Sequence, residues 1–238
     1  MKKLLVLFGL LMTILGVSAE PVEIGGIFYN LSTDYQTAEV TSSPDAEYHY
    51  AGEVVIPASV EYEGETYNVY SIGGSAFEGC SELTAVHFAN SVNFIGVNAF
   101  KDCTALSILY LPNSVVSISG YAFNGCTSLT HLTLGRNITQ IRTLAFANCP
   151  LLTTVVCKAE NAPNVNANIF DQETINQATL KIPTNSLTSY QSDFLWKSFH
   201  EIVEYDLVSY NLDYFVNEVQ HKHFEQDEGD IIFPEAYP

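Results

Sequence analysis

One ten-residue pattern is written four times between Ser71 and Cys149: SIGGSAFEGC at 71–80, FIGVNAFKDC at 94–103, SISGYAFNGC at 117–126 and QIRTLAFANC at 140–149. In each copy the Ala-Phe pair and the closing Cys stand at the same places, and each copy begins at the twenty-third position after the previous start. Fixed periods of roughly 20 to 50 residues are typical of stacked repeats, because each unit buries the apolar side of its neighbour. The sequence therefore predicts a solenoid.

The segment before each copy repeats as well. Leu83, Val86 and Phe88 begin one unit, and the following units place apolar residues at the same spacing, three and then two positions apart: Leu106, Leu109, Leu111; Leu129, Leu132, Leu134. This is the spacing of leucine-rich repeats. We expect a β-rich leucine-rich-repeat solenoid of the α/β horseshoe type, with parallel strands about 4.8 Å apart.

The rest of each unit predicts a return limb and a tight corner. Apolar residues recur there in two sets, which indicates a second short strand: Val92, Val115, Ile138; Ile95, Ile118, Ile141. The four repeated Phe residues should form an aromatic spine. Gly79 and Gly125 suit a left-handed turn, and Asp102 and Asn148 at the equivalent positions tolerate one better than most residues.

The N-terminus has the pattern of a secretory signal peptide. Lys2-Lys3 precede an apolar run from Leu4 to Val17, and small residues follow up to Ala19. We assign residues 1–19 to this signal and expect a secreted or cell-surface protein without membrane insertion after cleavage. An uncleaved anchor is the alternative, although the apolar run is short for a membrane span.

The charge is strongly acidic and unevenly placed. The whole chain has 9 − 27 = −18, and removal of Lys2 and Lys3 leaves 7 − 27 = −20. Residues 20–80 contain no Lys or Arg, whereas residues 81–149 are nearly neutral. This balance argues against nucleic acid as a partner, since phosphates are bound by Lys and Arg, and against attraction to anionic lipid. The acids could also serve only to keep the protein soluble.

The cysteines predict a buried ladder of thiols rather than disulfides. Four of them occupy one repeat position, so their side chains should stack in parallel instead of facing each other. Cys157 stands at a strand position and should also be buried. Cysteines separated by a whole repeat match no zinc pattern, and we expect neither a metal nor a cofactor.

The ends should cap the array. We divide the chain into a signal peptide (1–19), an N-terminal β cap (20–70), the repeat array (71–170), a C-terminal cap (171–204) and a loosely ordered acidic tail (205–238). The array should degrade where Pro163 interrupts the return limb. The C-terminal cap should contain a strand at 178–183 and a helix at 187–199, in which Trp196 is a capping anchor rather than a ligand platform.

These residues carry a resemblance to a known family. The segments IPxSV at 56–60, LPNSV at 111–115 and the constant repeat step that closes on Cys resemble the bacterial leucine-rich repeats of the BspA type, over about residues 50–204. The resemblance implies an exported or surface-displayed protein. Some members of this family are adhesins for host matrix proteins or other bacteria, which implies a binding role here.

The sequence contains no recognisable catalytic motif. The chain has no P-loop, GxGxxG, GxSxG or HExxH motif, and residues 81–149 lack the paired carboxylates of a glycosidase. His87 and His131 lie two coils apart and cannot share a proton or a metal. We therefore predict a protein without enzymatic activity, leaving a hydrolase that uses the N-terminal acids as a minor alternative.

The outward positions of the repeat strands form a neutral surface, which we predict as the ligand-binding face. Small polar and aromatic residues there could bind an extracellular protein or glycan at little desolvation cost. An inert solvated sheet, or a structural subunit of the cell envelope that acts through its acidic ends, are the alternatives. The predicted ligand-binding residues are Thr84, Ala85, His87, Ser107, Ile108, Tyr110, Thr130, His131, Thr133 and Thr154.

Overall fold

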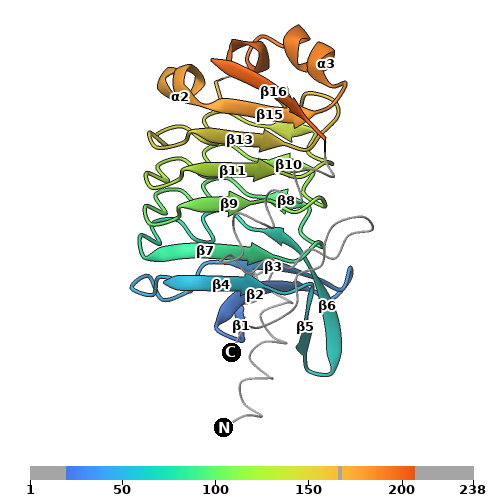
Figure 1. The fold of residues 1–238 in the computed structure, drawn as a ribbon. Helices are drawn as coiled ribbons and strands as arrows, with labels where there is room; N and C mark the ends of the chain where they lie inside the picture. The colour runs from blue at the N-terminus through green and yellow to red at the C-terminus, as the bar shows by residue number, and fades with distance from the viewer. Residues whose placement is uncertain (1–19, 166–167, 207–238) are drawn as a thin grey trace, which may run out of the picture.

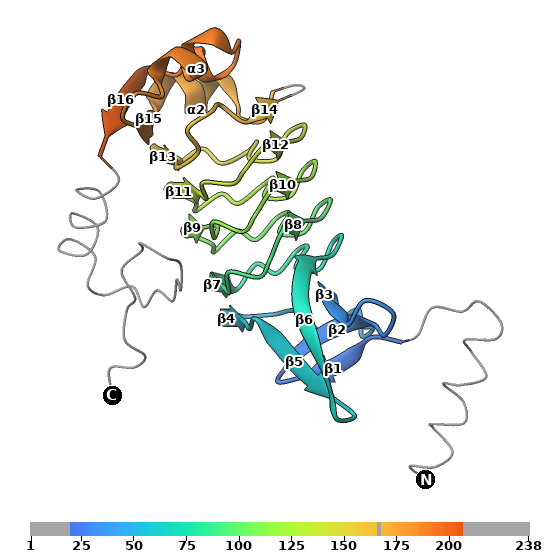
Figure 2. The same cartoon turned by 90° about the vertical axis from the view of Figure 1, so that its right-hand side faces the viewer.

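The structure is a computed structural model, which describes residues 20–165 and 168–206. The predicted signal peptide and most of the predicted acidic tail lie outside these residues. The fold is the predicted one: coils stack into a solenoid, and each coil contributes one strand to each of two walls, in which the strands of neighbouring coils run parallel (Figure 1). Seen from the side, the strands of the leucine-rich segments line one wall, and the strands of the return limbs line the other (Figure 2).

The first wall is the sheet that the leucine-rich spacing predicts. Its parallel strands are β9 (Ile108–Tyr110), β11 (His131–Leu134), β13 (Thr154–Cys157), β15 (Thr179–Pro183) and β16 (Glu201–Tyr205), and below them β4 (Gly52–Ile56) pairs with β7 (Leu83–Phe88). Leu132 lies opposite Leu109 on one side and Val155 on the other. Residues one repeat apart are therefore neighbours, as the sequence period requires.

The second wall contains the return strands. They are β8 (Phe94–Ile95), β10 (Ser117–Ile118), β12 (Gln140–Ile141) and β14 (Asn164–Val165), again parallel and in register. Pro163 does not interrupt this limb, contrary to the prediction. Proline has no N–H to donate to a ladder but is tolerated where a strand begins, so β14 starts directly after it, and Val165 pairs with Ile141.

The N-terminal segment extends the second wall with longer strands. These are β1 (Val22–Ile24), β2 (Ile27–Ser32), β3 (Thr37–Thr41), β5 (Ser59–Tyr62) and β6 (Glu65–Ile72). The turn between β5 and β6 holds Glu63 at φ 53° and Gly64 at φ 86°, two left-handed residues that match the twist of a hairpin. β6 then pairs in parallel with β8, which joins this segment to the coils.

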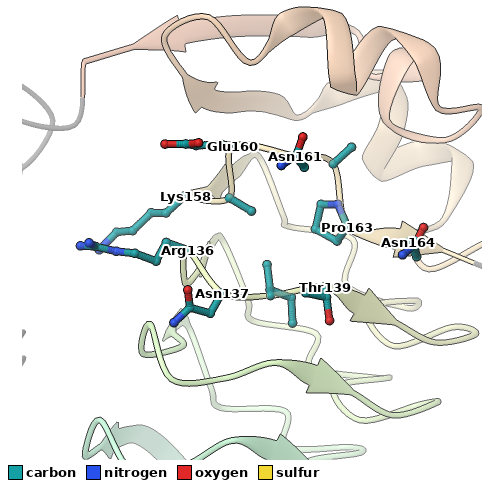
Figure 3. A pocket seen from close by; sticks show the side chains of 11 residues that line it. Arg136, Asn137, Thr139, Lys158, Glu160, Asn161, Pro163 and Asn164 are labelled. Carbon is teal, nitrogen blue, oxygen red and sulfur yellow. The ribbon is translucent and has the colours of Figure 1, made fainter.

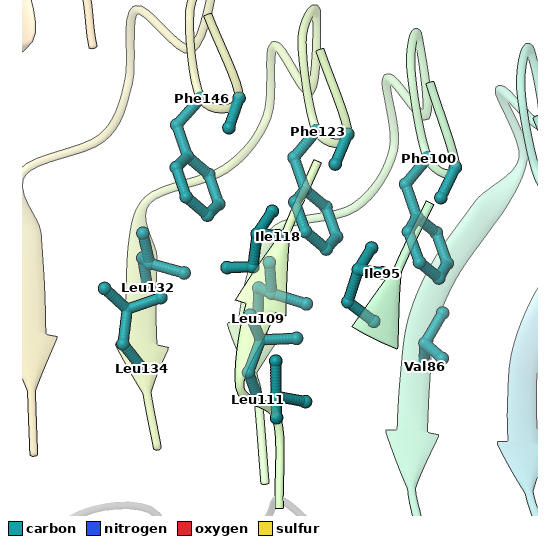
Figure 4. Close-up of a cluster of buried hydrophobic side chains, with 14 of the residues drawn as sticks. Val86, Ile95, Phe100, Leu109, Leu111, Ile118, Phe123, Leu132, Leu134 and Phe146 are labelled. Carbon is teal, nitrogen blue, oxygen red and sulfur yellow. The ribbon is translucent and has the colours of Figure 1, made fainter. Parts of the chain in front are cut away.

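The core consists of stacked identical layers, with an aromatic spine at the corner of each coil (Figure 4). Phe77, Phe100, Phe123 and Phe146 are fully buried, and their ring centroids lie 4.7, 5.0 and 5.3 Å apart in nearly parallel planes. Phe170 continues the stack at 5.6 Å. The predicted left-handed corner is also present, with φ between 57° and 79° at Gly79, Asp102, Gly125 and Asn148.

The cysteines form the predicted ladder. All five are buried and unbridged. The Sγ of Cys103, Cys126 and Cys149 each donates a hydrogen bond to the carbonyl of the Phe one coil below, at 3.1, 3.3 and 3.4 Å. Burial raises the pKa of Cys149 to about 12 and that of Cys157 to about 11. Since the thiolate is the reactive form, these thiols are inert near neutral pH.

The C-terminal cap differs in part from the prediction. The helix expected over residues 187–199 is two pieces, α3 (Leu187–Ser192) and the 3-10 helix η1 (Trp196–Ser198). Asp193 breaks it, because its Oδ1 accepts hydrogen bonds from the amides of Leu195 and Trp196 and so starts a new turn. A short helix, α2 (Gln172–Gln177), precedes β15. Trp196 is fully buried and packs on Phe170, as expected of a capping anchor.

Candidate binding surface

The register of the strands arranges the predicted surface residues in two lanes and a row. The lanes run across neighbouring strands, and the row lies at the strand starts. The Tyr110 lane contains His87, Tyr110, Thr133 and Val156; the Ile108 lane contains Ala85, Ile108, His131 and Thr154; the hydroxyl row contains Thr84, Ser107, Thr130 and Thr153. The structure thus brings the predicted residues together on one face.

Side chains of the hydroxyl row are hydrogen-bonded to the backbone of the neighbouring coil. The Thr130 hydroxyl donates a hydrogen bond of 3.1 Å to the Ser107 carbonyl, and the Thr153 hydroxyl donates one of 3.5 Å to the Thr130 carbonyl. The Thr130 oxygen also lies 2.9 Å from Nδ1 of His131, which fixes that ring on the face. These side chains connect adjacent coils, so their hydroxyls are partly used within the protein.

Thr133 must be removed from the predicted ligand-binding set. It points outward on β11 but is only 4% exposed. Tyr110 and Val156 lie in register with Thr133 on either side. Val156 itself is 2% exposed. Strand alternation predicted the direction of these side chains correctly but not their accessibility.

The face carries charged residues at its ends, beyond the predicted residues. Beyond the repeats, the Tyr110 lane runs from Val55 through Lys181 to Val203, and the Ile108 lane runs from Glu53 through Thr179 to Glu201. Glu53 Oε2 lies 3.5 Å from Nε2 of His87, so His87 faces a carboxylate on the neighbouring strand. The uncharged part is therefore the centre, around Ile108, Tyr110 and His131.

Sequence reasoning missed a groove beside this face (Figure 3). It has a volume of about 510 Å³ and lies between the turn after β11 and the turn after β13, lined by residues 136–139 and 158–164. The signal was present in the sequence, because the step from Phe146 to Phe170 exceeds the repeat period by one position. One extra residue in this turn prevents it from stacking on the turn below.

The two turns that line the groove are hydrogen-bonded to different parts of the protein. On the lower side, Asn113 Oδ1 accepts a 3.0 Å hydrogen bond from the Arg136 amide, just as Asn90 does for the Ser114 amide one coil earlier. Arg136 stands one repeat after Asn113, and its side chain has no acceptor, so it cannot bind an amide of the turn above in the same way. The upper turn is hydrogen-bonded to the C-terminal cap instead. Tyr190 Oη donates a hydrogen bond of 2.7 Å to the Ala159 carbonyl, and Trp196 Nε1 donates one of 2.9 Å to the Pro163 carbonyl.

A second feature that sequence reasoning missed is an aromatic pair on the return limb. Tyr70 and Phe94 are 43% and 40% exposed, and their rings meet edge to face at 5.3 Å.

Among the described residues no cluster of His, Cys, Asp and Glu could hold a metal ion. Nor do the ranges 20–165 and 168–206 contain a helix that is long and apolar enough to cross a membrane.

The fold and its outward sheet face define a leucine-rich-repeat protein, and comparison with known proteins identifies the family to which it belongs. The sequence profile of the BspA type leucine-rich-repeat region matches residues 64–177 in six copies. A leucine-rich-repeat protein from Bacteroides capillosus is 30% identical, with 59% of this chain and 99% of that chain covered and a TM-score of 0.51. The chain belongs to the BspA-type leucine-rich-repeat family.

Two further solved structures have the same fold. The leucine-rich-repeat protein of T. pallidum is 25% identical over 68% of this chain and 71% of that chain, with a TM-score of 0.56. A leucine rich cell surface protein from Faecalibacterium prausnitzii is 24% identical, with a TM-score of 0.51; the match covers 70% of this chain and 46% of that chain, so this chain spans less than half of its length. No functionally curated protein matches significantly. The fold is generally a non-catalytic scaffold, which supports a repeat-based binding module.

Proposed function

We propose that this protein is an exported, adhesin-like binding module that recognises an extracellular protein or glycan through the centre of its repeat sheet. The observation that carries the proposal is the uncharged centre of the face in a strongly acidic chain. Ile108, Tyr110 and His131 lie on adjacent strands there and are half-buried. Rigid aromatic and small polar groups of this kind supply contact area and hydrogen bonds at low entropic cost.

Export is part of the same proposal. The N-terminal segment Lys2–Ala19 has the composition of a signal peptide. The Faecalibacterium protein with the same fold is described as a cell surface protein. The inert, unbridged thiols are compatible with such a compartment, because buried thiols with raised pKa values resist oxidation.

An assembly role through the acidic ends is the second candidate. It is favoured by the N-terminal segment, where Glu47, Glu53, Glu61, Glu63 and Glu65 occur without a Lys or Arg between residues 20 and 80. A partner at that end would be basic, and its binding would rely on charge.

Capture of partners at two salt concentrations separates these functions. The mature chain, immobilised, is exposed to extracellular matrix proteins and mucosal glycans at about 0.1 M and about 0.5 M NaCl. Binding through the neutral centre should change by less than about threefold, because the screening length affects mainly charged contacts. Binding through the acidic ends should fall more than tenfold. A partner lost at high salt would contradict recognition by the sheet face.

A further inference from the structure

The first wall ends on its N-terminal side in an open strand edge. β4 is the outermost strand there, and among the described residues it pairs only with β7, in parallel. In Figure 2, β1, β2 and β3 lie toward the second wall, so β4 forms the lower end of the first. Parallel strands are joined through alternate residues, because successive residues direct their backbone groups to opposite sides. Every second residue of β4 therefore directs its N–H and C=O away from β7.

Glu53 and Val55 are the residues with these outward backbone groups. The Ile56 carbonyl accepts a hydrogen bond of 3.0 Å from the Ala89 amide, on the β7 side. Val54 lies two residues earlier and faces the same way, so Glu53 and Val55 face the other. Within the ranges 20–165 and 168–206, no backbone hydrogen bond is made by the N–H and C=O groups of these two residues on that side.

The edge is open to solvent. Val55 is 57% exposed and the Glu53 side chain 68%, whereas the outward residues of β9, inside the wall, are half-buried. Val54 and Ile56, which point inward from β4, are buried. The core beneath β4 is thus already covered, and the strand lacks only a partner for its backbone. Such an edge is a template for pairing with another chain.

The charge around the edge selects the strand that can pair with it. Residues 20–80 contain no Lys or Arg, and Glu53 projects from β4 itself. Its carboxylate contacts Nε2 of His87 at 3.5 Å and still remains mostly exposed. A second copy of this chain would add further carboxylates at the edge, Glu53 from β4 or Glu201 and Glu204 from β16. Like charges directly opposite each other destabilise strand pairing, so the charge favours a basic segment instead.

We propose that β4 binds an extended basic segment of another protein as an additional strand. Main-chain hydrogen bonds to Glu53 and Val55 supply the affinity, as in other sheets that are extended by a peptide. The outward side chains supply the specificity: a Lys or Arg lies opposite Glu53, and an apolar residue two positions along lies opposite Val55. This goes beyond recognition by the sheet centre, and it gives assembly through the acidic N-terminal end a defined binding mode.

Hydrogen exchange of the mature chain, measured by NMR, tests the strand pairing directly. The probe is the peptide Lys-Thr-Val-Thr-Lys-Thr-Val-Thr with blocked ends, in which alternation places Lys and Val on one face of an extended strand. With saturating peptide, the Val55 amide should exchange at least about tenfold more slowly, because it then donates a hydrogen bond. Exchange of the Ile56 amide, which faces β7, should not change.

Variants of β4 give the second readout, by isothermal titration calorimetry. Val55→Pro removes the outward N–H and no bond to β7, and proline is tolerated on an edge strand. It should weaken peptide binding by about tenfold or more. The matched control Val55→Ala keeps the N–H and should weaken binding by about threefold or less. Glu53→Lys should reverse the preference, so that the same peptide with Glu in place of Lys binds more tightly.

Three results would overturn the proposal: no binding of the peptide to the wild-type chain, equal affinities for wild type and Val55→Pro, or binding that leaves the Val55 amide unprotected. In the last case, charge alone would hold the peptide. A dimer in sedimentation that Val55→Pro dissociates would overturn it too, because the edge would then pair with a second copy. None of these results bears on the sheet centre, since Tyr110 and His131 lie on β9 and β11.

Discussion

Replacing Phe123 by Ala should destabilise the protein by about 3 to 5 kcal/mol, the range measured for large aromatic residues in cores. The ring is fully buried and stacks on Phe100 at 5.0 Å and on Phe146 at 5.3 Å. The neighbouring coils are fixed by their own strand pairing, so they cannot collapse into the space that the ring leaves. Urea unfolding followed by circular dichroism measures the loss.

Phe194→Ala is the matched control. Phe194 belongs to the C-terminal cap and is 54% exposed, so its truncation should change the free energy of unfolding by less than about 1 kcal/mol. If Phe123→Ala also stayed below about 1 kcal/mol, the Phe residues of neighbouring coils would not be stacked in register.

Gly135→Ala should cost about 3 kcal/mol, the upper part of the range for overpacked cores. A Cβ at this position would lie 2.2 Å from the Pro112 carbonyl oxygen and 2.7 Å from Cα of Asn113. Both atoms belong to the backbone of the preceding turn, which Asn113 ties to the Arg136 amide, so they cannot move aside separately. The melting temperature and the urea midpoint should both fall.

Gly74→Ala provides the comparison for this prediction. Its Cβ would meet no atom closer than the Val97 carbonyl oxygen at 3.5 Å, and Val97 itself occupies the equivalent position one coil later. Because the backbone there accepts a side chain, Gly74→Ala should be neutral or stabilise by a few tenths of a kcal/mol. Equal losses for the two variants would indicate that the turns at Pro112 and Gly135 do not approach so closely.

The periodic positions could be predicted because stacking in register gives each of them the same surroundings in every coil. Phe100 and Phe123 differ only in which ring lies above and below them, so one rule covers both. The rule fails where the period changes. The groove lies where one extra residue precedes Phe170. In the sequence, this residue shows only as one spacing between repeated Phe positions that is longer by one than the others.

Features of single elements were harder to predict from the sequence. β4 takes the place of a repeat strand inside the expected N-terminal cap, although only Val54 and Ile56 keep the repeat spacing. α2 buries just Thr174 and Ile175, too few residues for a helical period to be recognised. On the face, alternation gives the outward direction of Thr133 but not its exposure, which depends on packing that the strand pattern does not contain.

The affinity of Tyr110→Ala for a captured partner tests most directly whether the middle of the repeat sheet recognises that partner. Tyr110 is the large amphipathic residue at the centre of the face, where binding energy concentrates. The dissociation constant should rise by a factor that corresponds to about 1 to 3 kcal/mol, while the free energy of unfolding stays unchanged.

His131→Ala should raise the dissociation constant less. Removal of residues 207–238, which spares β16 and Tyr205, should leave it unchanged, and so should Tyr35→Ala, which alters a tyrosine that is 80% exposed in the N-terminal segment. Unchanged affinity for Tyr110→Ala, with binding abolished by that deletion, would contradict the account.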